Sequence, residues 1–163
     1  MRLIASRPTR CGNLRCVKVH LLLADAAQTD GLGKLGTLGL GWSITGTPAP
    51  PHAVVLLLRL GWAETQKPHR LELALVRADG EPVRVPETAE PGSASAAVRI
   101  AFELEVSRPV GLPEGAEVDH NTAFTIGPGL PFEAGTRYEW RLTVNGERDD
   151  EWVVPFYVRT PKP

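Results

Sequence analysis

The chain has 163 residues, 42% of them apolar, and a formal net charge of −1. This length supports one domain with its own core, and the low net charge excludes a general attraction to nucleic acid or to an anionic membrane surface. Only two cysteines are present and no apolar run reaches the length of a transmembrane helix, so we expect neither a secreted disulfide scaffold nor a membrane-spanning protein.

The first segment, residues 1–16, is predicted to be a flexible basic leader outside the domain. It shows no apolar alternation, and it contains both cysteines, Cys11 and Cys16. A cleaved signal peptide is a weaker interpretation, because the apolar run that follows is shorter than the roughly 7 to 15 residues that such a peptide needs. A zinc site made of the two cysteines and His20 lacks a fourth ligand.

The domain itself, predicted over residues 17–159 and followed by a tail at 160–163, is expected to be all-β. Short apolar runs, many with two-residue alternation, are separated by glycine and proline, and no long stretch has helical spacing. This pattern is typical of half-buried antiparallel strands in a sandwich or barrel. We expect an antiparallel β-sandwich of eight or nine strands. The predicted strands cover residues 17–24, 34–42, 53–62, 70–78, 81–85, 97–106, 121–127, 138–144 and 152–158.

The last two predicted strands form a hairpin. Apolar residues occupy every second position from Tyr138 to Val144, and the pair Asn145-Gly146 follows. Asn-Gly tolerates the positive φ angles of a hairpin turn. Pro155, in the second strand, has no amide hydrogen, so this strand is expected to lie at an edge or to carry a bulge.

The stretch before this hairpin, LPFEAGTRYEW, resembles the tyrosine corner of immunoglobulin-like sandwiches. In that motif a tyrosine near the start of a late strand forms a hydrogen bond with the backbone a few residues upstream. Tyr138 is predicted to donate this bond, with the corner at Ala134 and Gly135. Trp140 stands where antibody domains place a cysteine, so the resemblance is to the immunoglobulin-like architecture alone.

Several longer motifs resemble an uncharacterised bacterial family. They are LLLADAAQ (21–28), GKLGTLGLGW (33–42), KPHRLELAL (67–75), AGTRYEWRLTVNG (134–146) and PFYV (155–158). The resemblance covers residues 17 to 159 and implies a cytoplasmic β-sandwich. It implies no catalytic residues.

No motif in the sequence assigns a catalytic, cofactor or metal residue. GLGKLG (31–36) has dinucleotide-site spacing but no helix follows it, and GWSITG (41–46) misplaces the second glycine of a nucleophile elbow. Asp119 and His120 are adjacent on a strand and should face opposite sides. The acids at 149–151 are better explained as a charged hairpin tip than as a cation site. The sequence therefore indicates a protein that is not an enzyme and has no cofactor.

Two predicted strands are apolar on both faces, which indicates a second apolar patch outside the core. We expect Leu22, Val55 and Leu57 to form this patch and to contact a second copy of the chain or another protein partner. In the alternative interpretation, the leader or a loop covers the patch within one chain. The function predicted is a module that acts through protein contacts or self-association; a small-ligand or carbohydrate binding domain, with tryptophans as a platform, is the alternative.

Overall fold

The computed structural model describes residues 17–31, 33–87 and 94–161, and the predicted leader with its two cysteines lies outside them. The described part contains twelve β-strands and one short 3-10 helix, Trp62–Glu64. The strands are β1 (Val17–Ala24), β2 (Ala26–Thr29), β3 (Leu35–Leu38), β4 (Ile44–Thr45), β5 (His52–Leu60), β6 (Pro68–Arg77), β7 (Arg84–Pro86), β8 (Ser95–Ala97), β9 (Arg99–Glu105), β10 (Val118–Ile126), β11 (Arg137–Val144) and β12 (Val153–Val158).

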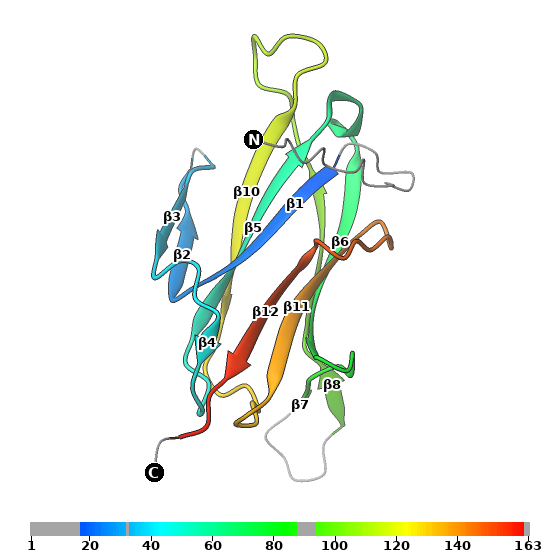
Figure 1. The fold of residues 1–163 in the computed structure, drawn as a ribbon. Coiled ribbons are helices and arrows are strands. Elements are labelled where there is room, and N and C mark those ends of the chain that lie inside the picture. Colours follow the sequence, from blue (N-terminus) through cyan, green and yellow to red (C-terminus); the bar gives the residue numbers. More distant parts are fainter. Residues whose placement is uncertain (1–16, 32, 88–93, 162–163) are drawn as a thin grey trace, which may run out of the picture.

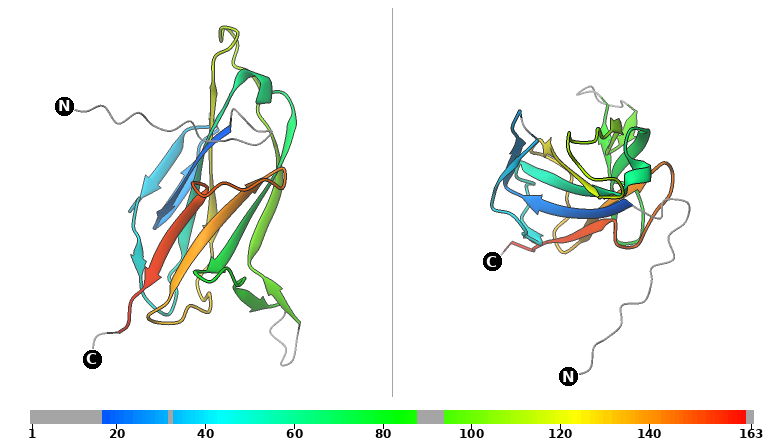
Figure 2. Two further views of the ribbon diagram at one scale, coloured as in Figure 1. Left: turned by 45° about the vertical axis from the view of Figure 1, so that its right-hand side comes forward. Right: turned by 90° about the horizontal axis from the view of Figure 1, so that it is seen from above.

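Two larger sheets face each other, and this confirms the predicted all-β antiparallel sandwich (Figure 1, Figure 2). One sheet has the order β1-β5-β10, and the other has the order β4-β12-β11-β6-β9. Two small hairpins, β2-β3 and β7-β8, are attached to them. The strand count exceeds the predicted eight or nine because short strands such as β2, β4 and β8 contain too few residues for a visible alternation.

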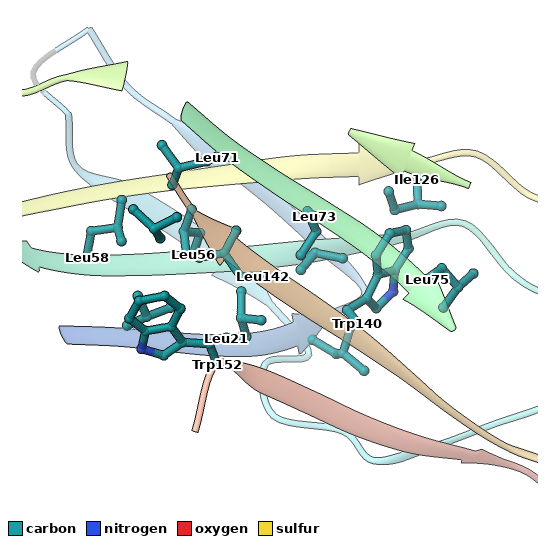
Figure 3. Close-up of a cluster of buried hydrophobic side chains, with 14 of the residues drawn as sticks. Leu21, Leu56, Leu58, Leu71, Leu73, Leu75, Ile126, Trp140, Leu142 and Trp152 are labelled. Atoms are coloured by element: carbon teal, nitrogen blue, oxygen red, sulfur yellow. The ribbon is translucent and has the colours of Figure 1, made fainter. Parts of the chain in front are cut away.

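The core lies between the two sheets because the alternating apolar residues of both sheets point inward. The three-stranded sheet contributes Leu21 and Leu56, and the five-stranded sheet contributes Leu73, Trp140 and Leu142, all nearly or fully buried (Figure 3). Burial of such side chains contributes roughly 1.5 to 3 kcal/mol each. This apolar interior holds the two sheets together.

The predicted turn and the proline position are both present. Asn145 and Gly146 join β11 toward β12 with φ angles of 52° and 81°, as the Asn-Gly pair requires. β4 pairs with β12 only at Tyr157 and Val158. Pro155 therefore lies where β12 has β11 on one side and no described strand on the other, so its missing amide hydrogen costs no ladder bond.

The tyrosine corner forms, but with the hydrogen bond in the opposite sense. The Glu133 backbone N–H donates to the Tyr138 hydroxyl oxygen at 2.9 Å, so the hydroxyl accepts where the sequence predicted a donor. Gly135 has a φ of 78° and donates its own N–H to the Val158 carbonyl at 2.7 Å. The positive φ explains why glycine occupies this corner, and the two bonds fix the entry into β11.

Candidate functional site

The outer face of the three-stranded sheet carries the patch that the sequence predicted as an interface. Val55 lies opposite Leu22 on β1 and Ala123 on β10. Ala27 and Leu35 of the β2-β3 hairpin pack onto this small cluster, and Val55 is only 1% exposed. The prediction that Val55 belongs to an exposed interface is therefore wrong, because a segment of the same chain covers it.

The rest of this face is less completely covered. Leu22 and Leu57 are half-buried, and Leu57 lines a shallow groove of about 210 Å³ with Lys18, His20 and Asn121. Charged pairs border the groove, with Lys18 Nζ 2.7 Å from Glu117 and Arg59 Nε 2.6 Å from Asp119. A partner contact centred on Leu22 and Leu57 remains a prediction, but the available apolar surface is smaller than expected.

Four exposed large apolar side chains lie instead on residues 38–44 and on β12, the strand that pairs with β4. We call the set Leu38, Leu40, Ile44 and Tyr157 the apolar strip. Their exposed fractions are 69%, 49%, 59% and 41%. Among the described residues, the only other exposed large apolar side chain is Val110, in the loop between β9 and β10. Exposed apolar residues that cluster in this way mark interaction surfaces more often than scattered ones do.

Backbone hydrogen bonds to both sheets fix the segment that carries the strip. The Asp25 N–H donates to the Leu38 carbonyl at 3.0 Å, and the Gly41 N–H donates to Leu23 at 2.7 Å. The Tyr157 N–H then donates to the Ser43 carbonyl at 2.9 Å. Residues 38–44 therefore cross from β1 to β12, and the strip has a rigid backbone at both ends.

Two local features turn the strip outward. Gly39 has a φ of 62°, and a Cβ there would meet the Asp25 carboxylate at 2.0 Å, so only glycine fits without a shift. Trp42 points inward, with its ring 5.8 Å from the Phe156 ring and 5.7 Å from the His52 ring. The segment thus packs its half-buried tryptophan against the core and leaves Leu38, Leu40 and Ile44 at the surface.

A charged groove lies on the outer face of the five-stranded sheet. Its volume is about 490 Å³, and its lining contains three arginines and three acids. These are Arg137, Glu139, Arg141, Arg148, Asp149 and Asp150. Because the charges balance, the groove selects neither an anion nor a cation by net charge.

The acids at 149–151 do not converge on a cation position. The Asp149 side chain accepts a hydrogen bond from the Glu151 N–H at 2.9 Å, as in a turn. Across the described residues, no three metal-ligating side chains of His, Cys, Asp or Glu cluster together.

Asp119 and His120 lie on opposite faces of β10, as expected for adjacent strand residues. Asp119 points outward to Arg59, whereas His120 lies on the inner face of β10, where burial lowers its pKa. His69 is buried between the Glu64 carbonyl, 2.7 Å from its Nε2, and the Asn145 side chain, 3.1 Å from its Nδ1. The first contact ties the 3-10 helix to the start of β6 and the second ties the β11-β12 turn to it, which is a structural role.

The structure also shows where the glycine-rich motif and the four tryptophans lie. The described residues of 31–36 form a turn and the start of β3, with no helix after them. Trp140 and Trp152 are buried, and Trp62 is half-buried beneath Arg108, whose guanidinium carbon lies 3.9 Å from the ring centre. None of the four tryptophans lines the charged groove.

Sequence reasoning missed the apolar strip. The signal was present, because Leu38, Leu40 and Ile44 lie within seven residues that also contain Gly39 and Gly41. The glycine-rich run 34–42 predicts a strand but does not show which of its leucines are exposed. In the structure Trp42 packs against Phe156, whereas Leu38 and Leu40 are exposed.

Comparison with known proteins identifies the family. A family model described as a family of unknown function, DUF6941, matches residues 20–159. The chain belongs to this family, which confirms the resemblance to an uncharacterised family. Comparison with curated proteins and with solved structures gave no match. The part of the chain that the structure describes contains no helix with the length and hydropathy needed to cross a membrane.

Proposed function

We propose that this DUF6941 member is a non-catalytic protein-binding module that associates with a second copy of itself through the apolar strip. The observation that carries the proposal is the gathering of Leu38, Leu40, Ile44 and Tyr157 on one backbone-fixed segment and its neighbouring strand. A rigid surface loses little conformational entropy on binding, which favours its use as a docking site.

The charges beside the strip favour a second copy as the partner. Exposed Asp25 lies at the Leu38 end, where its N–H bonds the Leu38 carbonyl at 3.0 Å. Exposed Arg159 lies near the Ile44 end, where its N–H bonds the Thr45 carbonyl at 3.0 Å. A two-fold axis through the strip would bring Asp25 of each copy toward Arg159 of the other. Such self-complementarity is what a symmetric dimer interface requires.

The test compares lysine substitutions inside and outside the strip. In sedimentation velocity over a concentration series, the wild type should show a concentration-dependent dimer, and Leu40→Lys and Ile44→Lys should shift it to monomer. Val110→Lys is the matched control, because Val110 is also exposed but lies outside the strip, in the loop between β9 and β10. Far-ultraviolet circular dichroism should show the same fold in all variants. A wild type that stays monomeric throughout would refute self-association.

Small-ligand binding is a second candidate, and the groove on the five-stranded sheet is the observation in its favour. Its volume of about 490 Å³ is within the roughly 300 to 1,000 Å³ of known ligand pockets. Its balanced charges suit a small zwitterion such as a free amino acid. Isothermal titration with a panel of amino acids should show binding that Arg137→Gln weakens; no heat from any of them argues against this candidate.

The immunoglobulin-like character of the sandwich and a cytoplasmic location are proposed as well. The contact between Tyr138 and the Glu133 backbone supports the first. The small number of cysteines supports the second. Fractionation of cells that produce the tagged full chain would test the location.

A further inference from the structure

Three ring nitrogens in the core have no hydrogen-bond partner among the described residues. They are Nε1 of Trp42, Nε2 of His52 and Nε1 of Trp140, and all three are inaccessible to solvent. Buried polar atoms in folded proteins are almost always satisfied by protein or by ordered water. Three orphaned nitrogens in neighbouring side chains therefore require a common explanation.

The three side chains meet around one imidazole. The His52 ring centre lies 5.7 Å from that of Trp42 and 6.4 Å from that of Trp140. Trp42 comes from the strip-bearing segment, His52 begins β5 in one sheet, and Trp140 belongs to β11 in the other. The three unpartnered nitrogens therefore belong to rings that pack side by side in one region of the core.

The hydrogen-bonding capacity of the three nitrogens is fixed by their chemistry. Each indole Nε1 can only donate. Nδ1 of His52 lies 3.2 Å from the Pro50 carbonyl, which can only accept, so Nδ1 carries the proton. Nε2 of the neutral ring is then an acceptor, and burial lowers the pKa of His52, which keeps the ring neutral. The cluster thus offers two donors and one acceptor.

We propose that Trp42, His52 and Trp140 bind one internal water molecule. Its oxygen accepts from both indole N–H groups, and one of its hydrogens is donated to Nε2 of His52. An anion without a proton cannot donate to Nε2, and a metal cation cannot accept from the indoles. A larger neutral ligand does not suit a site whose His52 and Trp140 side chains are 2% and 0% exposed. Water meets all of these conditions.

An alternative explanation places the indole N–H groups against aromatic rings. Trp42 is nearly perpendicular to both His52 and Phe156, at 77° and 80°, so its N–H could face a ring. This arrangement would satisfy Trp42 alone. The Nε2 lone pair of His52 would remain unpaired, and Trp140 is tilted at 57° to the imidazole. The water accounts for all three nitrogens together.

The site has a structural consequence that does not depend on dimerisation. One water molecule would link the segment behind the apolar strip to both sheets of the sandwich. Ordered waters of this kind are costly to remove, so the water would stabilise the position of residues 38–44 against both sheets.

The test uses the full chain in solution and in crystals. In nuclear magnetic resonance, the indole protons of Trp42 and Trp140 should show direct cross-relaxation with a long-lived water, and the nitrogen shifts of His52 should identify a protonated Nδ1. Trp42→Phe should reduce the water signal at Trp140 several-fold. Trp152→Phe, which changes a buried tryptophan outside the cluster, should leave it unchanged.

A high-resolution crystal structure should show an isolated density peak within hydrogen-bond distance of all three nitrogens. Three results would overturn the proposal: no such peak, indole protons shifted upfield by a ring face without a water signal, or a water signal at Trp140 that is unaffected by Trp42→Phe. The wild-type measurements decide the question even if a variant fails to fold.

Discussion

The two outer faces of the sandwich carry opposite chemistry and are treated differently by the chain. On the three-stranded sheet the outward residues around Val55 are apolar, and the β2-β3 hairpin packs over them. On the five-stranded sheet the outward residues include Glu72, Arg99 and Arg141, and the face stays open as grooves. A second apolar face therefore does not by itself indicate a binding partner, because a hairpin of the same chain can pack over it.

The largest effect is expected from a charge placed under the hairpin. Val55→Lys should lower the free energy of unfolding by at least about 3 kcal/mol, because an unpaired ammonium would be buried. Ala101→Lys is the matched control, since Ala101 faces outward on β9 and is exposed; it should stay within about 0.5 kcal/mol of wild type. Urea unfolding measures both. Equal effects would show that the two faces are not different.

Weakening the cover should have a smaller effect. Leu35→Ala removes a half-buried side chain that packs on the patch from the hairpin, and we expect a loss of about 1 to 2 kcal/mol. Hydrogen exchange should accelerate at the hairpin amides while β6 and β11 stay protected. Unchanged exchange at the hairpin would mean that Leu35 does not hold the cover in place.

Two tyrosine substitutions compare the inner and outer sides of the five-stranded sheet. Tyr138→Phe should cost about 1 kcal/mol, because the Glu133 N–H loses its acceptor. Tyr157→Phe, on the neighbouring strand but 41% exposed, should be close to neutral in the same thermal melts. A neutral Tyr138→Phe would remove the corner as a stabilising feature.

The smallest effect is expected from surface ion pairs. The hydrogen bond from Arg59 lowers the pKa of Asp119, although the slight burial acts the other way. Because the folded pKa is depressed, this contribution is present above the ordinary pKa of 3.8 and is lost as the pH falls through the folded value. Asp119→Asn should remove a small, salt-sensitive part of the stability at neutral pH. Glu72→Gln, whose oxygen lies 3.9 Å from Arg99, should remove even less.

The sequence was sufficient to predict the strands whose alternation is set by burial on one face. The run at 17–24 was predicted with the bounds observed for β1, and the alternation predicted from Tyr138 to Val144 lies within β11. The roles of Gly135, Asn145 and Gly146 were predictable for a similar reason, because each residue adopts a positive φ angle that its type tolerates. Local steric and solvation effects act within a few residues, and so they leave a local pattern.

The β2-β3 hairpin that covers Val55 and the apolar strip were not predictable from local sequence. β2 has the sequence AAQT and β3 has LGTL, and neither contains an alternation that shows which surface it will pack against. The cluster of Trp42, His52 and Trp140 brings together residues nearly one hundred positions apart. Only the tertiary arrangement of the sheets decides that these rings meet, and no local signal encodes it.

The parallel pairing of β4 with β12 has a consequence for biosynthesis. Ile44 pairs with Tyr157, so β4 cannot pair during synthesis until β12, encoded more than a hundred codons later, has been translated. Contacts between such distant segments form slowly, because the intervening chain must first be ordered. During that interval Trp42 lacks Phe156 of β12, one of the rings that it packs against in the folded domain. Nascent chains with such exposed apolar segments are prone to aggregate, so chaperone dependence should be greatest just before β12 emerges.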